Sequence, residues 1–219
     1  DTLLVGSRFM RQELIQNGFN KNKVHILPPV VPAQNLHPTA VPASATILYV
    51  GQLIRGKGVD LLLQSLNLLR CDFKAIIVGT GNAEPALKAL CSRLGLAAKV
   101  EFRGWVDHAA LEAHYAAARV VAVPSRWPEP FGMIGLEAMR QGRPVVAFAV
   151  GGIPDWLQDG VTGILVAEQD VAAFAGALER LLNDPDAARE MGRGALAAAH
   201  EKFAFDRYLQ ALSEYLRGE

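Results

Sequence analysis

Two glutamates separated by small and apolar residues are the side chains of this sequence best suited to hold a polar ligand. Glu129 and Glu137 stand eight positions apart, and Glu137 is the only charged residue from Pro130 to Met139. A carboxylate in such surroundings needs a partner, because an unpaired buried charge is costly. Backbone donors alone are one solution. The other is a ligand with hydroxyl groups, held by two acids about two helical turns apart.

The residues after Glu129 predict the start of a helix. Pro130 suits the first helical turn, where its missing N–H costs nothing, and Glu129 then lies where the helix dipole favours a negative charge. The free backbone N–H groups of Phe131, Gly132 and Met133 would point out of this helix start. Because such groups bind anions, the pattern predicts a phosphate-bearing ligand.

A glycine-rich loop earlier in the chain carries a lysine. From Gly51 to Gly58 it reads GQLIRGKG, close to the phosphate loop of mononucleotide kinases and ATPases. Gly58 stands where that loop needs a Ser or Thr hydroxyl for magnesium, which disfavours an ATPase. Lys57 precedes a predicted helix, where the dipole disfavours a cation unless an anion is bound. We therefore expect Lys57 to contact an anionic ligand and not to be a solvated surface cation.

Together these segments resemble a known family. The run EPFGMIGLEAM, which begins at Glu129, is similar to the signature of the retaining nucleotide-sugar glycosyltransferases of family 4, in which seven residues separate two glutamates. This family has the GT-B fold. The resemblance implies that Glu129 lies beside the donor sugar and that Glu137 holds the ribose hydroxyls. It also implies that Lys57 grips the donor diphosphate, with the amides that follow Glu129, in place of a metal ion.

Three further loops match the family less completely. Its Gly-Arg-Leu motif reads Gly51-Gln52-Leu53 here, so Gln52 replaces an arginine, and Arg55 is the residue expected to take over the phosphate contact. Gly79 is implied to line the donor cleft. The segment FRGWV resembles the element whose backbone reads the nucleobase, which implies contacts at Arg103 and Val106.

Other motifs have simpler explanations. The Gly-Thr-Gly that begins at Gly79 fits a dinucleotide fingerprint poorly, because Glu84 stands at the place of the third glycine. Trp105 either packs or joins the base site. The Gly-Gly pair at 151–152 with Asp155 is similar to the family's Gly-Gly, two residues, Glu, one methylene shorter. Asp184 and its neighbours have the spacing of a metal site but are expected to cap a helix.

The alternation of elements predicts a doubly wound α/β domain with a parallel, Rossmann-like sheet of six strands, the GT-B C-terminal domain in the resemblance. Near-continuous apolar runs mark the strands, at 46–50, 73–78, 99–102, 120–123, 144–147 and 163–166. Three alanine-rich helices are expected after them, at 170–182, 185–202 and 206–217. The carboxyl ends of the strands should carry the ligand site.

The domain boundaries follow from the prolines. Residues 1–27 predict a strand, a helix capped by Ser7, and a second strand at 24–27; the resemblance identifies them as a remnant of the N-terminal acceptor domain. Residues 28–44 are a proline-rich linker, and 45–219 form the donor-binding domain. Without its own sheet, the remnant should be poorly packed, swapped with another chain, or folded against the main body.

The composition of the chain limits the classes of partner that it is expected to bind. Acidic and basic residues number 22 each, so no net charge draws the chain to nucleic acid. No apolar run is long enough for a membrane span, although peripheral membrane contact stays open for a longer protein, and no signal peptide is visible. The two cysteines predict reduced core thiols of a cytoplasmic protein and no metal site. The oligomeric state, the base, the sugar and the acceptor are left open.

The sequence therefore predicts a retaining hexosyltransferase that uses a UDP- or GDP-linked sugar, with no other cofactor, and of which this chain is mainly the donor-binding half. A glycan or lipid-linked acceptor would bind through the missing N-terminal domain. A non-catalytic nucleotide-sugar binding module would keep Glu137 but not require Glu129. A nucleotide-sugar epimerase of related fold is the other alternative.

Overall fold

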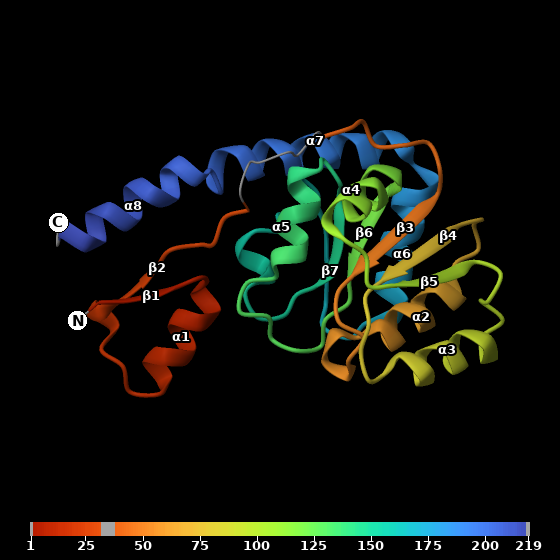
Figure 1. Ribbon diagram of the computed structural model, residues 1–219, viewed down its shortest axis with the longest axis horizontal. Helices are drawn as coiled ribbons and strands as arrows, with labels where there is room; N and C mark the ends of the chain where they lie inside the picture. Colours follow the sequence, from red (N-terminus) through yellow and green to blue (C-terminus); the bar gives the residue numbers. More distant parts are fainter. Residues whose placement is uncertain (1, 32–37, 218–219) are drawn as a thin grey trace.

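The computed structural model describes residues 2–31 and 38–217, which form a small N-terminal unit beside a larger α/β body (Figure 1). In the small unit, β1 (Leu3–Val5) and β2 (Val24–Ile26) pair in parallel. Helix α1 (Arg8–Gln16) and the 3-10 helix η1 (Lys21–Lys23) connect these strands. The unit therefore has the predicted order of strand, helix and strand.

The main sheet has six parallel strands in the spatial order β5, β4, β3, β6, β7, β8. Their bounds are β3 Thr46–Val50, β4 Lys74–Val78, β5 Val100–Gly104, β6 Val120–Val123, β7 Val145–Phe148 and β8 Gly163–Val166. The chain starts at β3, moves out to β5, and returns to β6 on the other side of β3. The switch point therefore lies between β3 and β6, where open α/β sheets bind ligands. The predicted fold is confirmed, with strand ends that differ by one or two residues.

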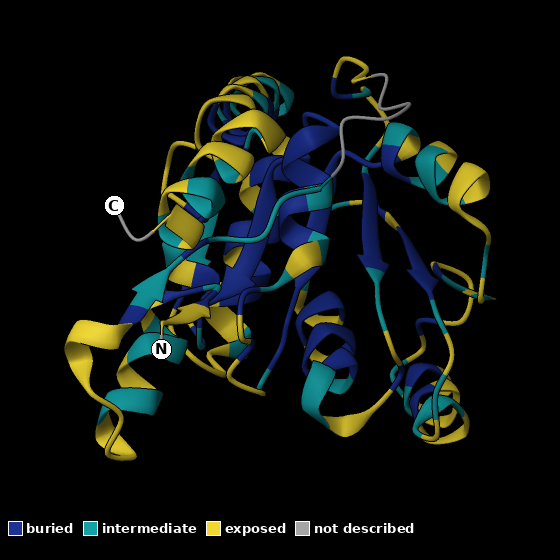
Figure 2. Cartoon of the chain, turned by 60° about the vertical axis from the view of Figure 1, so that its left-hand side comes forward, coloured by how far each residue is buried: buried dark blue, intermediate teal, exposed yellow. Residues whose placement is uncertain are grey.

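Helices pack on both faces of the sheet and bury its strands (Figure 2). They are α2 Val59–Leu68, α3 Glu84–Arg93, α4 His108–Ala117, α5 Met133–Arg140, α6 Val171–Asn183, α7 Pro185–Lys202 and α8 Phe205–Arg217, with 3-10 helices η2 (Arg55–Lys57) and η3 (Ile153–Asp155). The three C-terminal helices are confirmed. Asp184 caps α7, because its carboxylate accepts hydrogen bonds from the N–H groups of Asp186 and Ala187.

The N-terminal unit is folded against the main body. The Ser7 hydroxyl donates to the Pro130 carbonyl at 2.5 Å, and it also accepts from the N–H of α1 as the predicted cap. The Arg8 N–H and Nε donate to the Asp155 carboxylate at 2.6 and 2.8 Å. Of the three arrangements expected for a strand and helix without their own sheet, the structure has the third.

Helix α8 runs from the main body to the N-terminal unit (Figure 1). Its Tyr215 ring packs on His25 of β2, with ring centroids 5.1 Å apart. The resemblance implies a final helix that crosses back in this way. Helix α8 and α1 therefore tie the two parts of the chain together at separate points.

Buried arginines attach the linker to the main body, a feature that the sequence did not predict. Three guanidinium groups donate hydrogen bonds to backbone carbonyls of the linker: Arg119 to Pro42, Arg140 to Val31 and Arg143 to Thr39. Burial lowers the pKa of Arg143 to about 10, so the guanidinium is still charged at neutral pH. Residues 32–37 of the predicted linker lie outside the described residues.

Candidate active site

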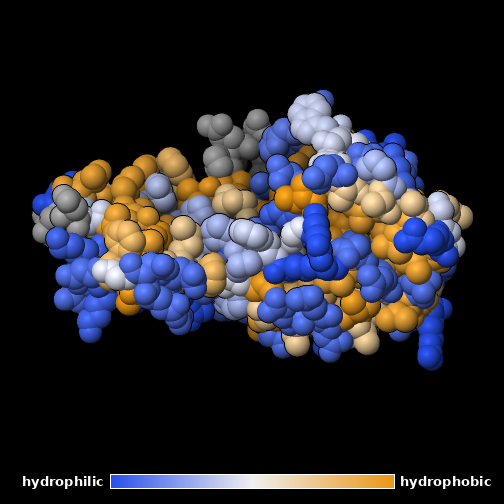
Figure 3. Space-filling model, turned by 90° about the horizontal axis from the view of Figure 1, so that it is seen from below, coloured by the Kyte–Doolittle hydropathy of each residue, from blue (hydrophilic) through white to orange (hydrophobic). Residues whose placement is uncertain are grey.

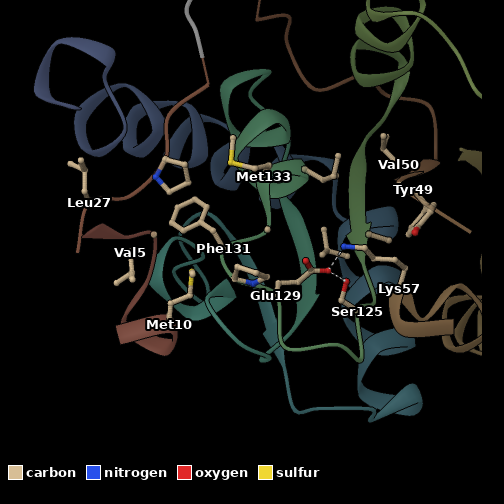
Figure 4. Close-up of a pocket in the computed structure, with 18 of the residues that line it drawn as sticks. Val5, Met10, Leu27, Tyr49, Val50, Lys57, Ser125, Glu129, Phe131 and Met133 are labelled. Atoms are coloured by element: carbon tan, nitrogen blue, oxygen red, sulfur yellow. Dashed lines mark hydrogen bonds and ion pairs between the residues drawn. The ribbon is translucent and has the colours of Figure 1, made fainter. Parts of the chain in front are cut away.

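The carboxyl ends of β3 and β6, on either side of the switch point, bring three polar side chains together. Lys57, in the loop after β3, donates from Nζ to Glu129 Oε1 at 2.6 Å. Ser125 follows β6 and donates its hydroxyl to the same oxygen at 2.6 Å (Figure 4). Glu129 is only 7% exposed. Its charge is therefore stabilised by a cation and a hydroxyl, as a buried carboxylate requires.

The loop that carries Lys57 is held against the loop after β6. Gly58 has a φ of 68°, and a Cβ there would lie 1.9 Å from the Pro124 carbonyl oxygen. The N–H groups of Arg126 and Trp127 both donate to the Gly56 carbonyl at 3.0 Å. This packing explains the glycine at position 58 without a nucleotide. It also places Lys57 within reach of Glu129.

Helix α5 begins later than the sequence predicts. The prediction that Pro130 lies in its first turn is wrong: Gly132, with a left-handed φ of 96°, is the N-cap, and the helix starts at Met133. The first helical amides are therefore those of Met133 and Ile134, and the Gly135 N–H already bonds to the Gly132 carbonyl at 3.0 Å. Because Gly132 turns the chain, Pro130 lies in the preceding loop.

A buried tryptophan fixes this loop and the start of α5. Trp156 Nε1 donates to the Phe131 carbonyl at 2.6 Å. A Cβ at Gly135 would lie 1.9 Å from Cη2 of the Trp156 ring, so only glycine lets the helix approach the ring this closely. Sequence reasoning missed Trp156. The signal that points to it is a glycine inside a helix, where glycine is unfavourable unless packing requires it.

The loop with Gly151 and Gly152 supports the backbone of Glu129. The Gly152 N–H donates to the Glu129 carbonyl at 2.7 Å. Asp155, which the resemblance matched to a glutamate of the family, instead binds Arg8 through both carboxylate oxygens. In this structure Asp155 holds α1 in place, and the segment supports the site through its backbone.

Glu137 lies about one turn into α5, and it faces α4. Its Oε2 accepts a hydrogen bond from the Tyr115 hydroxyl at 3.1 Å. Burial raises the pKa of Glu137, while the Tyr115 hydrogen bond and the charge of His108 lower it. Burial and the Glu137 charge raise the pKa of Tyr115 well above its usual value. The carboxylate thus has a side-chain donor, and not only the backbone donors considered from sequence.

A cavity of about 590 Å³ lies between the N-terminal unit and the main body. Seven predicted site residues line it: Gly51, Lys57, Glu129, Pro130, Phe131, Gly132 and Met133. Tyr49 of β3 also lines it, and burial together with the Glu129 charge raises the pKa of its hydroxyl. The volume is in the range of small-molecule sites.

The other predicted site residues lie outside the lining of this cavity: Gln52, Arg55, Gly79, Arg103, Val106 and Glu137. Gln52 is exposed, and its carbonyl accepts from the Tyr49 hydroxyl at 2.9 Å. Arg55 is exposed in η2. Among the described residues, its side chain makes no hydrogen bond to Lys57, Ser125 or Glu129. Gly79 directly follows β4, and its N–H donates to the Gly104 carbonyl.

The predicted base-binding segment lies at the outer strand of the sheet. Arg103 of β5 pairs with Glu101 at 2.8 Å, and Val106 is half-buried against the core. Trp105 is exposed. Of the two roles that the sequence left open for it, packing in the core is therefore excluded. Among residues 2–31 and 38–217, no cluster of His, Cys, Asp and Glu is arranged to hold a metal ion.

Comparison with known proteins places the chain in a family. Residues 38–197 match the family described as glycosyl transferases group 1. The uncharacterized glycosyltransferase MJ1607 of Methanocaldococcus jannaschii is 36% identical over 162 residues, which cover 73% of this chain and 41% of that protein. The D-inositol 3-phosphate glycosyltransferase of Xylanimonas cellulosilytica is 32% identical over 234 residues, 97% of this chain and 55% of that one.

Solved structures agree with this family. Anabaena Alr3699/HepE in complex with UDP and glucose superposes with a TM-score of 0.91 and 25% identity, over 100% of this chain and 63% of that one. The chain therefore belongs to the group 1 glycosyltransferase family and has the GT-B C-terminal fold. It spans about half the length of the curated relatives it matches. In the part of the chain that the structure describes, no helix is long and apolar enough to cross a membrane.

Proposed function

We propose that this chain is the donor-binding half of a retaining, metal-independent hexosyltransferase of family 4. It moves a hexose from a nucleoside diphosphate sugar to a hydroxyl acceptor, in the cytoplasm. One observation carries the proposal: Lys57, Ser125 and Glu129 meet at the switch point of the sheet, in a cavity of suitable volume. A lysine beside a buried acid is the pairing that an anionic leaving group and a cationic sugar ring require.

Lys57 and the first amides of α5 take the donor diphosphate. In the free chain Lys57 is paired with Glu129, so the cation is already oriented and half-buried at the cavity wall. The amides of Met133 and Ile134 add the positive end of the helix dipole. The bond from the anomeric carbon to the diphosphate breaks with its electron pair on the phosphate oxygen. Lys57 and the amides stabilise the charge that develops there.

Glu129 orients the sugar. Its carboxylate is buried and held at a fixed position by two donors, which is the preorganisation that electrostatic catalysis needs. As the leaving group departs, positive charge grows on the sugar ring, and an ionised Glu129 beside the ring stabilises it. Glu137 holds the ribose hydroxyls, with Tyr115 fixing its orientation. Arg103 and Val106 stay candidates for the base contact.

UDP is the nucleotide that the comparisons favour, because the Alr3699/HepE structure holds UDP and glucose. A thermal-shift panel of UDP, GDP and ADP tests this choice. A ligand at a hundred times its Kd stabilises by about 2.7 kcal/mol, which for a chain of this size raises Tm by roughly 5–10 °C. We expect UDP to give this shift. No shift with any of the three nucleotides would contradict the proposal.

Replacing Glu129 with Ala separates an enzyme from a binding module. We expect sugar transfer from the donor to fall on the order of 100-fold or more, with the UDP thermal shift retained. The matched control is Glu190→Ala, an exposed acid on α7. A transfer rate that Glu129→Ala leaves unchanged would favour the binding module. Conversion of the donor to an isomer without any acceptor would favour the epimerase.

We expect the chain on its own to bind nucleotide but to transfer sugar only slowly, because it spans about half the length of its curated relatives. Rates are therefore compared as ratios between variants. Product stereochemistry, followed by NMR of the anomeric proton, tests retention. Full turnover by the isolated 219 residues would show that the donor-binding half is sufficient.

A further inference from the structure

A second ion pair joins the two loops that carry Lys57 and Glu129. Arg126, in the loop after β6, donates from Nη2 to Oδ2 of Asp60, in the first turn of α2. Asp60 is three positions after Lys57, and Arg126 is three positions before Glu129. Neither member of the pair lines the cavity. The pair can therefore affect a bound ligand either through the residues that it holds or through its charges.

This ion pair is poorly suited to stabilise the fold. The side chains of Arg126 and Asp60 are 24% and 32% exposed, and an ion pair partly open to water contributes little stability. The lower part of the main body in Figure 1, where α2 and α3 lie, presents many hydrophilic side chains when it is seen from below (Figure 3). Arg126 Nε is buried and, among the described residues, has no hydrogen-bond partner, which is unfavourable. Stability therefore does not explain why the pair stands at this place.

The loop after β6 holds the lysine loop on both sides of Lys57. On one side, the Arg126 N–H donates to the carbonyl of Gly56 at 3.0 Å. On the other side, Gly58 connects Lys57 to α2 with a left-handed φ of 68°, and glycine has the largest conformational freedom of all residues. The Arg126 side chain crosses this glycine, since a Cβ there would lie 3.6 Å from Arg126 Cγ, and ends at Asp60. The ion pair therefore fastens the chain beyond the flexible position.

The backbone position of Lys57 matters for the proposed chemistry. In the free chain its Nζ lies 2.6 Å from Glu129 Oε1, and the proposed function gives the same ammonium group a contact with the donor diphosphate. A lysine is a compact charge on a flexible stem, so its reach depends on where the backbone places it. If the loop were free to move, Lys57 would have to be ordered again when the diphosphate binds, which would lower the affinity.

We infer that Arg126 and Asp60 are a positioning pair, which holds Lys57 at the Glu129 end of the cavity and so prepares it for the donor diphosphate. The inference rests on the proposed function and deepens it by naming the residues that keep the phosphate-binding lysine in place. Both residues act through Lys57 and do not touch the ligand.

Calorimetric titration of UDP into the full chain separates positioning from the effect of charge. Asp60→Asn and Arg126→Gln each remove the ion pair, so positioning predicts that both raise the Kd for UDP, by about twofold to tenfold. The double variant should then be no weaker than the single ones, because the pair is lost only once. Charge alone predicts opposite effects, since Asp60→Asn makes the site more positive and Arg126→Gln makes it less so. Opposite effects would overturn the inference.

A background without the lysine shows whether the pair acts through it. In Lys57→Met, adding Asp60→Asn or Arg126→Gln should leave the Kd for UDP unchanged, whereas a general structural defect would weaken binding in this background too. Arg126→Lys keeps the charge and should restore part of the affinity that Arg126→Gln loses. The matched control is Asp186→Asn, which removes an arginine–aspartate pair on α7 and should not change the Kd. The Tm of every variant is measured to show that it is folded.

The positioning inference and the proposed function fail in different ways. If UDP does not bind, or if Lys57→Met leaves its Kd unchanged, Lys57 does not take the diphosphate, and the proposed function fails together with the inference. If Lys57→Met weakens binding while Asp60→Asn and Arg126→Gln have no effect, the positioning inference fails alone. An effect of Asp60→Asn that is as large without Lys57 as with it would also overturn the inference.

Discussion

The hydrogen bond from Tyr115 to Glu137 allows a direct test of how the nucleotide is held. Tyr115 is 3% exposed, and its hydroxyl donates to Glu137 at 3.1 Å. Tyr115→Phe removes this donor and keeps the buried ring. The carboxylate of Glu137 then loses the contact that, in the proposed function, orients it before the ribose binds.

The expected change in UDP affinity comes from the cost of ordering the Glu137 side chain. Since Tyr115 bonds to Glu137 in the free chain, its removal affects binding mainly through the side-chain freedom that Glu137 must then give up. Immobilising such a side chain costs about 0.5–1.5 kcal/mol, which corresponds to a Kd for UDP about twofold to tenfold higher at pH 8.

The pH dependence adds a second signature. Burial raises the pKa of Glu137, and the Tyr115 hydrogen bond and the His108 charge oppose this rise. Without the Tyr115 hydroxyl, the pKa of Glu137 rises further. Because ribose hydroxyls donate to an ionised carboxylate, UDP affinity should weaken as the pH falls through this pKa, and in Tyr115→Phe the weakening should begin at a higher pH.

The assay is calorimetric titration of UDP between pH 4.5 and 8. UDP affinity also changes with pH through the second ionisation of its terminal phosphate, with a pKa of about 6, and this part should remain in every variant. In a Glu137→Gln background the additional step due to Glu137 should vanish, and adding Tyr115→Phe should no longer shift the profile. Tyr215→Phe, a tyrosine that packs on His25, is the control for a lost hydroxyl elsewhere. If Tyr115→Phe lowers Tm but leaves both the Kd and its pH profile unchanged, Glu137 does not hold the nucleotide and the argument fails.

Two further predictions concern stability. Burial raises the pKa of Glu137 in the folded chain above its unfolded value. The protonated group therefore favours folding below the unfolded pKa, and this contribution is lost as the pH rises through the folded pKa. Glu137→Gln should raise the Tm of the free chain at pH 7.5 but not at pH 4, as measured by calorimetry. Gly135→Ala forces a Cβ onto Trp156, and overpacking of about 1–3 kcal/mol should lower Tm by roughly 3–10 °C. Gly176→Ala, where a Cβ meets no atom within 4 Å, should leave Tm unchanged or slightly higher, and equal effects of the two alanines would refute the packing argument.

The features predicted from sequence are those set by local pattern. Near-continuous apolar runs separated by helical segments are sufficient to define a parallel sheet, and strand order then places the loops after β3 and β6 at the switch point. The meeting of Lys57 and Glu129 follows from this topology. Helix ends were predicted where a side chain caps them, as at Ser7 and Asp184.

The features that the sequence did not predict depend on contacts between residues far apart in the chain. Pro130 suits a helix start, but the bond from Ser7 to its carbonyl and the left-handed Gly132 keep it in a loop. For Asp155, the sequence showed a likeness to a family motif but no partner, and the structure adds Arg8, 147 positions away. Tertiary contacts therefore decide where α5 begins and what Asp155 binds, and local propensity is weaker than such contacts.

The same contacts connect the two parts of the chain to the chemistry. Ser7 bonds to Pro130, the residue after Glu129, and Arg8 bonds to Asp155 of η3, whose preceding Gly152 supports the Glu129 carbonyl. The N-terminal unit therefore holds the backbone of the proposed catalytic acid from two sides. The Ser7 bond is on the residue after Glu129, and the Arg8 bond reaches Glu129 through η3 and Gly152, so we expect a displacement of α1 to shift the Glu129 backbone. If the proposed function is correct, the unit expected to belong to the acceptor side also sets the position of the acid proposed to orient the donor.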